Sequence, residues 1–208
     1  MYIDLDVHHG DGVENAFLYS DKVFTFSIHK FAPGFFPGTG SFDSQGRGKG
    51  LGYCLNIPVP HKISGDGFYA IFTKAFSKII SEFDPDIIVC VCGADILTDD
   101  PHSAFNVGSN SYSRCVKTIL DTKIPTVFLG GGGYNHTSTA KCWSILSHTI
   151  ISSDKAIQNL PELIPEHEFW PRYSLSDHLE VVESNILDPN ESDIILEIID
   201  RIENMKGS

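Results

Sequence analysis

The chain has 208 residues, of which 41% are hydrophobic and 20% are charged, and its formal net charge is -12 at pH 7. This length suits one domain with a sizeable core. The acidic balance argues against broad nucleic-acid binding, because phosphate contacts need lysine and arginine. No apolar run is long enough to cross a bilayer and no secretory signal is visible, so neither nucleic acid nor a membrane is expected as a direct partner.

Five cysteines are present without the spacing of a disulfide framework or of a zinc finger. Cys90 and Cys92 lie two residues apart in an apolar run, which indicates buried free thiols. Free thiols are typical of a reducing, intracellular location. The segment after Met1 is at once apolar and alternating, so we expect the natural protein to extend further upstream.

Apolar runs alternate with helical patterns, which predicts an α/β fold with a parallel sheet flanked by helices. Strands are expected, in chain order, at residues 2–6, 23–28, 53–57, 87–92 and 126–129. Helices are expected at residues 12–19, 67–83, 110–120, 138–150 and 192–204. The helix over 67–83 has the clearest apolar stripe, and Asp66 is its expected N-cap.

Two connections between these elements are unusual. Residues 29–52 contain seven glycines and an aromatic cluster, and a connection of this length tends to be functional or disordered. Its aromatic residues favour an ordered loop. Four glycines at 130–133 follow a strand directly, but they lack the sequence of a phosphate-binding loop. We assign residues 1–180 to one domain and residues 181–208 to a helical tail packed on it.

Polar side chains interrupt the apolar pattern at the ends of two predicted strands. If residues 2–9 are extended, Asp4, Asp6 and His8 share one side and the apolar side chains share the other. Burying them is costly unless they are paired or bind a cation. Asp95 follows a second strand, and ligands gather at the carboxyl ends of parallel strands. Two carboxylates and one imidazole suit a zinc-like ion with an open position, with capped turns and ion pairs as the alternative.

Four motifs then occur in order: DLDVHHGDGV at 4–13, PGFFPGTG at 33–40, GAD at 93–95 and GGGGYN at 130–135. From Tyr2 to about Tyr173 the chain resembles the class I histone deacetylases, and within that class the histone deacetylase 8 type. The resemblance implies an arginase-like and deacetylase-like α/β domain, present here in part. It also implies hydrolysis of N6-acetyl-lysine on histone tails and other proteins, in the nucleus and cytoplasm, with roles in chromatin and transcription.

The resemblance implies a role for each matching position of the reaction centre. Asp6, His8 and Asp95 match the zinc ligands, although such ligands also accept iron(II). The metal would polarise the amide carbonyl and lower the pKa of its bound water. Tyr134 matches the tyrosine that donates a hydrogen bond to the substrate carbonyl, a contact worth roughly 2.7–4 kcal/mol in other hydrolases.

Other matching positions concern the substrate channel and bound potassium ions. Phe36 matches one wall of the channel that grips the lysine stem, and glycines such as Gly132 let substrate approach the backbone closely. His102 stands where human members have an apolar residue, and it either bonds a ligand at the pocket or lies exposed in its loop. A first potassium site is implied at Asp4, Asp6, His8, Ser27 and Ile28. A second is implied at Phe17, Ser20, Val23 and Tyr53.

The family takes its general base from a tandem histidine pair, and this chain contains no match to it. His8 and His9 are not that pair, because His8 is assigned to the metal and His9 should face the other side of the strand. In the family, the positions of Asp4 and Asp11 hydrogen-bond the missing histidines and set their basicity. Their presence here indicates descent from a complete enzyme.

The leading hypothesis is therefore a metal-dependent lysine deacetylase, present as an incomplete catalytic domain. One alternative is a related amidohydrolase that acts on acetylpolyamines or another small amide. A second is a catalytically silent fragment that serves as a binding module. A binuclear arginase-type centre is disfavoured, because its D-x-H-x-D motif would require an acid at Gly10.

Overall fold

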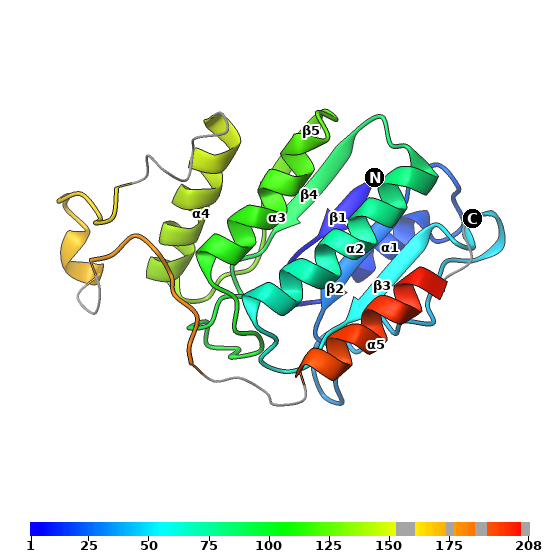
Figure 1. The fold of residues 1–208 in the computed structure, drawn as a ribbon, viewed down its shortest axis with the longest axis horizontal. Helices are drawn as coiled ribbons and strands as arrows, with labels where there is room; N and C mark the ends of the chain where they lie inside the picture. The colour runs from blue at the N-terminus through cyan, green and yellow to red at the C-terminus, as the bar shows by residue number, and fades with distance from the viewer. Residues whose placement is uncertain (153–160, 174–176, 186–190, 205–208) are drawn as a thin grey trace.

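The computed structural model describes residues 1–152, 161–173, 177–185 and 191–204 and contains a five-stranded sheet (Figure 1). Its strands are β1 (Tyr2–Asp4), β2 (Thr25–His29), β3 (Cys54–Pro58), β4 (Ile88–Cys92) and β5 (Thr126–Gly130). All neighbours are parallel, in the order β3-β2-β1-β4-β5. The predicted α/β class with a parallel sheet is confirmed, and β1 lies at the centre with β2 and β4 beside it.

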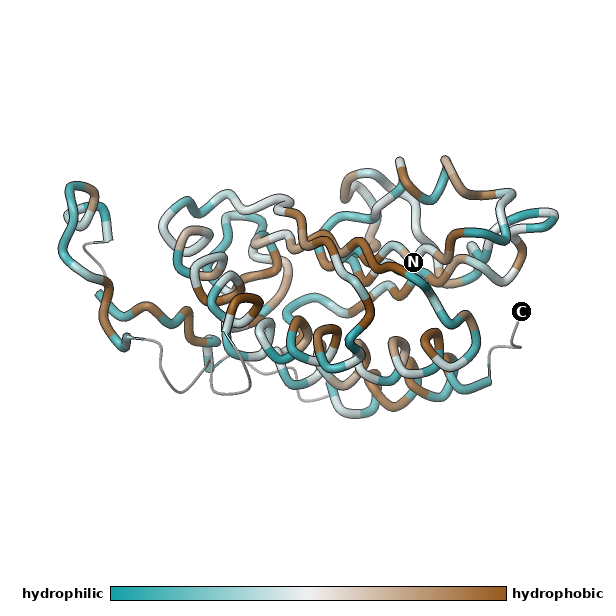
Figure 2. Tube along the Cα trace, turned by 90° about the horizontal axis from the view of Figure 1, so that it is seen from above, coloured by the Kyte–Doolittle hydropathy of each residue, from teal (hydrophilic) through white to brown (hydrophobic). Residues whose placement is uncertain are grey.

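The described helices are α1 (Asp11–Phe17), α2 (Gly65–Phe83), α3 (Ser109–Asp121), α4 (His136–Ile151) and α5 (Glu191–Asn204), with short 3-10 helices η1 (Gly48–Gly50) and η3 (Trp170–Tyr173). α2 and α3 lie side by side on one face of the sheet (Figures 1 and 2). α4 packs beside α3, α5 packs beside α2, and α1 lies on the opposite face. None of these helices has the length and apolar character needed to cross a bilayer.

The core lies mainly between the sheet and α2, whose apolar stripe was predicted from its spacing. Phe68, Ile71 and Phe72 are fully buried, and Phe72 stacks on Phe26 of β2 with ring centroids 6.2 Å apart. Cys90 and Cys92 are buried and free, as predicted, and the other three cysteines are also buried and free. The buried side chains of the sheet and of α2 therefore form a continuous hydrophobic core beneath the carboxyl ends of the strands.

The N-cap of α2 is Ser64, and the prediction of Asp66 was wrong. Ser64 Oγ accepts the N–H of Gly67 at 3.1 Å, from an extended backbone that precedes the helix. Asp66 lies inside the first turn, where its exposed carboxylate accepts a hydrogen bond from Arg114 at 2.6 Å. Its negative charge still suits the positive end of the helix dipole.

β1 ends at Asp4, two residues earlier than predicted. The N–H of Asp6 donates to Asp4 Oδ1 at 3.0 Å, and the N–H of His8 donates to Asp6 Oδ1 at 2.9 Å. Because these side chains replace a neighbouring strand as acceptors, the backbone bends over residues 6–8. The predicted alternation nevertheless continues, since Leu5 and Val7 are fully buried on the opposite side.

The two edges of the sheet differ. β3 is buried along most of its length and ends in Pro58. β5 is more open, and both Val127 and Leu129 are 45% exposed. Among the described residues, β5 pairs with β4 alone, so its other edge has no strand beside it.

Residues 177–185 and 191–204 pack against the rest of the described chain by apolar and charged contacts. Ile202 of α5 is fully buried against the core. Glu191 accepts the N–H of Ser64 at 2.6 Å at the start of α2, and Glu183 accepts the hydroxyl of Ser111 in α3 at 2.8 Å. Residues 186–190 and 205–208 of the predicted tail lie outside the described ranges.

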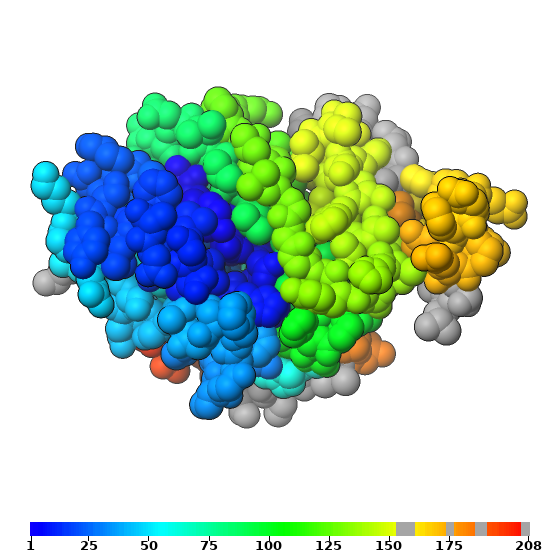
Figure 3. Space-filling model, turned by 180° about the vertical axis from the view of Figure 1, so that it is seen from behind, coloured from blue at the N-terminus to red at the C-terminus, as the bar shows by residue number. Residues whose placement is uncertain are grey.

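The glycine-rich connection between β2 and β3 is held against the sheet by buried histidines, as expected of an ordered loop. His29 donates from Nε2 to the carbonyl of Gly40 at 2.8 Å, and His9 Nδ1 lies 2.8 Å from Thr39 Oγ1. Gly40 has a φ of +91° and lies so close to His29 that a Cβ would clash with its ring. The connection (light blue) therefore reaches the same face as the blue N-terminal segment (Figure 3).

Candidate metal centre

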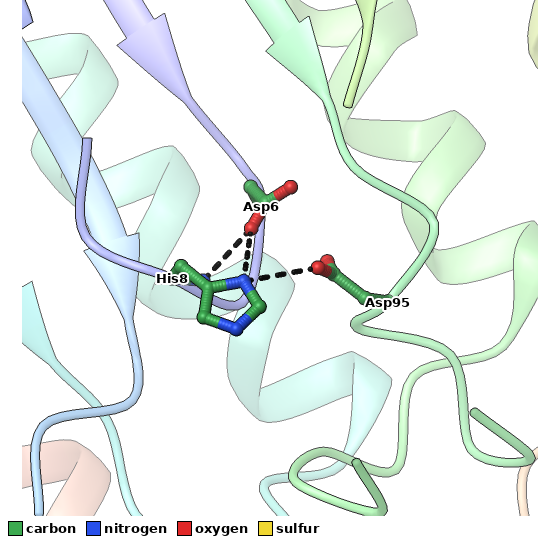
Figure 4. A group of neighbouring side chains, drawn as sticks. All are labelled: Asp6, His8 and Asp95. Atoms are coloured by element: carbon green, nitrogen blue, oxygen red, sulfur yellow. Dashed lines mark hydrogen bonds and ion pairs between the residues drawn. The ribbon is translucent and has the colours of Figure 1, made fainter. Parts of the chain in front are cut away.

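Three of the predicted ligands meet at the carboxyl ends of two central strands. Asp6 and His8 follow β1, and Asp95 follows β4 (Figure 4). One ligand atom from each lies within 4.8 Å of the others. His8 Nδ1 is the shared atom, 2.9 Å from Asp6 Oδ1 and 3.2 Å from Asp95 Oδ2. The parallel pairing of β1 and β4 brings the three side chains together, although 87 residues separate His8 from Asp95 in the chain.

Main-chain donors from two segments, after β1 and after β5, hold these carboxylates in place. Asp95 Oδ1 accepts the N–H of Val7 at 2.9 Å, which ties the loop after β4 to the bend after β1. Asp6 Oδ2 accepts the N–H of Gly132 at 2.7 Å, which adds the turn after β5. The same turn is linked to the β4 side by the N–H of Ala94, which donates to the carbonyl of Gly132 at 2.6 Å.

The carboxylates of this cluster differ in how many hydrogen bonds they accept. Asp95 is fully buried, and its Oδ2 accepts no hydrogen bond. Burial raises the pKa of Asp95, whereas hydrogen bonds from His8 and from backbone N–H groups outweigh burial at Asp6 and lower its pKa. The two carboxylates raise the pKa of His8 to about 10. A proton on Nδ1 thus occupies a position between two carboxylate oxygens, and a divalent cation fits that donor set.

Glycines make room for the carboxylates. A Cβ at Gly132 would clash with Asp95 Oδ2, and a Cβ at Gly93 would clash with Asp6 Oδ2. Gly10 is packed in the same way, since a Cβ there would lie 2.5 Å from Asp4 Oδ2. This leaves no space for the additional acid that a binuclear arginase-type motif would need.

Tyr134 lies in the turn between β5 and α4, beside the cluster. Its side chain is 51% exposed, and its ring packs against that of His102 with centroids 4.6 Å apart and planes tilted by 60°. Its N–H donates to Asp100 Oδ2 at 2.8 Å. Partial desolvation and the negative charges of Asp95 and Asp6 raise the pKa of Tyr134, so the phenol keeps its proton at neutral pH.

Two aromatic side chains of the glycine-rich connection contact His8. Phe35 stacks on its ring with centroids 5.3 Å apart and planes 10° apart, and Phe36 meets it edge-on at 6.0 Å. Phe36, the predicted channel wall, is 73% exposed. Phe35 was not among the predicted site residues, although both residues belong to the aromatic cluster of this connection.

His102 is exposed in its loop, and its ring also contacts the residues of the cluster. Its ring lies edge-on to His8 at 5.1 Å and contacts both Phe35 and Tyr134. Its Nδ1 lies 3.0 Å from Asp100 Oδ1. Asp100 is a second residue that sequence reasoning missed, and the available signal was its place five residues after Asp95 in the same loop.

The residues predicted to support the missing histidines differ in their surroundings. Asp4 is buried and accepts a hydrogen bond from the Tyr2 hydroxyl at 2.5 Å. Burial raises the pKa of Asp4 to about 6 despite that bond. Asp11 opens α1 with a partly exposed side chain, and it lines a polar cavity with His9 and Glu14.

The predicted potassium-binding positions lie at the sheet and at the end of α1. Ser27 pairs with Asp4 across β1 and β2, and its hydroxyl lies 2.8 Å from His29 Nδ1. Ile28 is buried in β2 beside it. In the second set, Phe17, Ser20, Val23 and Tyr53, the carbonyl of Phe17 accepts the N–H of Ser20 and that of Tyr53 accepts the N–H of Thr25. Ion binding at either set stays a prediction.

Comparison with known proteins identifies the family. Residues 1–150 match the histone deacetylase domain. Histone deacetylase 8 of Danio rerio is 41% identical over the whole chain, which covers 54% of that protein. Histone deacetylase 8 of Xenopus laevis is 40% identical, and the match covers 97% of this chain and 61% of that protein. Histone deacetylase 1 of Homo sapiens is 35% identical, and the match covers 99% of this chain and 42% of that protein. The chain thus spans about half the length of these relatives, and it belongs to the histone deacetylase family, within class I and similar to histone deacetylase 8, as its motifs predicted.

Proposed function

We propose that this chain carries the metal-ligand and tyrosine part of a metal-dependent lysine deacetylase centre. The observation that carries the proposal is the cluster of Asp6, His8 and Asp95, in which a buried Asp95 oxygen accepts no hydrogen bond. Tyr134 stands beside it in the turn that also contacts Asp6. Family membership supports the same function, and the chain spans about half the length of the relatives that it matches.

Asp6, His8 and Asp95 would hold a zinc ion, with iron(II) as the other ion that these ligands accept. The ion would supply Lewis acidity toward the amide carbonyl and a more acidic bound water. His8 must lose its Nδ1 proton to become a ligand, and its neighbours raise its pKa to about 10. Metal binding should therefore release a proton and weaken as the pH falls.

Tyr134 would donate its hydroxyl proton in a hydrogen bond to the carbonyl oxygen of acetyl-lysine. This contact strengthens as negative charge develops on that oxygen, so it stabilises the transition state more than the substrate. Phe36, together with Phe35, would line the channel for the four methylenes of the lysine stem. Gly132 would let the substrate lie close to the backbone, since it carries no side chain between the turn and the carboxylates.

The general base must come from elsewhere in the complete protein. His9 is engaged at both ring nitrogens, with Thr39 Oγ1 at 2.8 Å and Glu14 Oε2 at 2.6 Å. Asp4 and Asp11 would orient the histidine pair that the family uses. Potassium ions would bind at the two predicted potassium sites, one that includes Ser27 and one that includes Tyr53. Their positive charge would alter the electrostatic potential near the metal.

The proposed substrates are acetylated lysines of histone tails and other proteins, in the nucleus and cytoplasm. The consequence would be regulation of chromatin and transcription, as in the deacetylases that this chain resembles. The domain assignment proposed with it is residues 1–180 as catalytic-domain segment and 181–208 as a tail packed on that segment. An acetylpolyamine amidohydrolase and a catalytically silent binding module are the two competing outcomes of the tests below.

The first test is metal binding by the purified 208-residue chain. Titration with Co²⁺, followed by visible absorbance, should reveal one site. Asp95→Asn should weaken it by more than the roughly 10–100-fold that losing an outer-shell partner costs. Asp66→Asn is the matched control, because Asp66 is an exposed aspartate that pairs with Arg114 away from the cluster. Equal affinity of the three proteins would refute the metal assignment.

The second test separates the substrate classes in the complete gene product. We expect kcat/KM to be higher for acetyl-lysine peptides than for acetylpolyamines, and Tyr134→Phe to lower kcat by about 10²–10³-fold. A preference for acetylpolyamines would replace the protein substrate with a small amide. Metal binding without turnover of either substrate would favour the silent binding module.

A further inference from the structure

Asp100 is a buried carboxylate with no role in the function proposed above. Its side chain is 1% exposed, and within the described residues no lysine or arginine forms a salt bridge with it. Oδ1 accepts the N–H of His102 at 2.9 Å and lies 3.0 Å from the Nδ1 of the same residue. Oδ2 accepts the N–H of Tyr134 at 2.8 Å. Both oxygens are therefore used, and each serves a different residue of the site.

These bonds join two loops that carry different parts of the centre. Asp100 lies in the loop between β4 and α3, five residues after Asp95. Tyr134 lies in the turn between β5 and α4. The bond from Tyr134 N–H to Asp100 thus fixes the tyrosine backbone relative to the loop that holds a metal-ligand candidate. A buried carboxylate satisfied in this way is costly to replace by any group that leaves the N–H unpaired.

The same carboxylate fixes the ring against which Tyr134 packs. Asp100 Oδ1 contacts both the backbone N–H and the Nδ1 of His102, so it holds the ring as well as the main chain of that residue. This sets the orientation of the imidazole, which contacts the Tyr134 ring at 4.6 Å and the His8 ring at 5.1 Å. Tyr134 is 51% exposed, so few other contacts restrict its side chain. The direction of the Tyr134 side chain therefore depends on the Tyr134 backbone and on the His102 ring. Asp100 contacts both of them.

We propose that Asp100 is a positioning residue that aims the Tyr134 hydroxyl at the reacting carbonyl, through the Tyr134 backbone and the His102 ring. The inference rests on the proposed function, in which Tyr134 touches the substrate. Asp100 itself touches neither metal nor substrate in this scheme. A misplacement of about 1 Å at a reacting group can cost roughly 10²-fold in rate, so the position of this hydroxyl has a large effect.

Asp100→Asn is the sharpest variant, because it keeps the shape and removes one acceptor. An amide has a single oxygen, so it can accept from Tyr134 or from His102 but not from both through two oxygens. Asp99→Asn is the matched control: it removes the neighbouring charge, and Asp99 bonds Asn135 and Ser138 instead of Tyr134.

The structural arm of the test needs no activity. With 3-fluorotyrosine at position 134 of the purified chain, the wild-type ¹⁹F resonance should lie away from that of the free amino acid. Asp100→Asn should move it toward the free value, and Asp99→Asn should leave it unchanged. A resonance that Asp100→Asn leaves in place, or that Asp99→Asn moves equally, overturns the proposal. If Asp100→Asn does not fold, His102→Ala replaces it, and an unchanged resonance there is equally contradictory.

The kinetic arm uses the complete gene product. Asp100→Asn should lower kcat for an acetyl-lysine peptide by about 10–100-fold, with KM and Co²⁺ affinity nearly unchanged. Co²⁺ affinity that falls in parallel with kcat would mean that Asp100 merely supports the Asp95 loop, and would refute a positioning role. If the wild-type protein turns over no substrate, the proposed function fails while the ¹⁹F arm still decides the placement of Tyr134.

Discussion

His29 lies in a buried polar network beneath the candidate metal centre, and it should make stability depend on pH. Its Nε2 donates to the Gly40 carbonyl and its Nδ1 lies 2.8 Å from the Ser27 hydroxyl. The residue is fully buried, and its ring lies 4.7 Å from that of His9. Desolvation lowers the pKa of His29 to about 4, against 6.5 for an ordinary histidine. The folded state therefore keeps it neutral.

The sign follows from proton binding. Between pH 6.5 and about 4 the unfolded chain binds a proton at His29 that the folded chain does not, so the free energy of unfolding falls as the pH falls. Above pH 6.5 this contribution is complete. With one pKa unit worth about 1.36 kcal/mol, the loss between pH 7.5 and pH 5 is about 2 kcal/mol. Asp4 acts in the opposite direction, because burial raises its pKa to about 6.

The assay is urea unfolding at pH 7.5, 6 and 5 for the wild type and His29→Gln. Glutamine keeps a donor for the Gly40 carbonyl but does not titrate, so the difference between the two proteins isolates His29. We expect the wild type to lose about 2 kcal/mol more than the variant between pH 7.5 and pH 5. His136→Gln, at an exposed histidine, is the control and should follow the wild type. Parallel curves for wild type and His29→Gln would refute a neutral buried imidazole.

Two further predictions concern packing. Gly132→Ala should cost about 1–3 kcal/mol of unfolding free energy and weaken Co²⁺ binding, because the added Cβ would clash with Asp95. The control Gly12→Ala should be neutral or stabilising by up to about 1 kcal/mol, because a Cβ there would have no neighbouring residue within 4 Å. Equal destabilisation by the two substitutions would contradict this prediction. Ile202→Ala should cost about 2–5 kcal/mol, and Leu196→Ala, at a 64% exposed position of the same helix, less than about 0.5 kcal/mol, both measured by urea denaturation. A small effect at Ile202 would mean that α5 adds little to the core.

Periodicity predicted the elements well because burial repeats along each of them. All five strands and all five helices were expected near their observed places, and the apolar stripe that includes Phe68 and Phe72 faces the core. The ends of the helices and strands were predicted less accurately, because local hydrogen bonds determine where each element begins and ends. Ser64 caps α2 through one side-chain bond, and β1 stops where Asp4 and Asp6 accept N–H groups from their own segment.

The candidate site was predictable where it follows from strand ends and motifs, and unpredictable where distant loops meet. Asp6 and Asp95 could be placed together because parallel strands end at one edge. The contact of Phe35 with His8 depends on how a 24-residue connection folds, and no spacing rule specifies that. Asp100 escaped notice for the same reason, since its partner Tyr134 is 34 residues away on another loop.

The open edge of β5 has a consequence for which side of the described sheet can accept a further strand. A parallel strand with one free side presents unpaired N–H and C=O groups at regular intervals, which is a template for a strand from another chain. The half-exposed side chains of Val127 and Leu129 add apolar surface beside it. The opposite edge is protected, because β3 is buried and closes with a proline. Among the described residues, the sheet thus offers a further strand a more open edge beside β5 than beside β3.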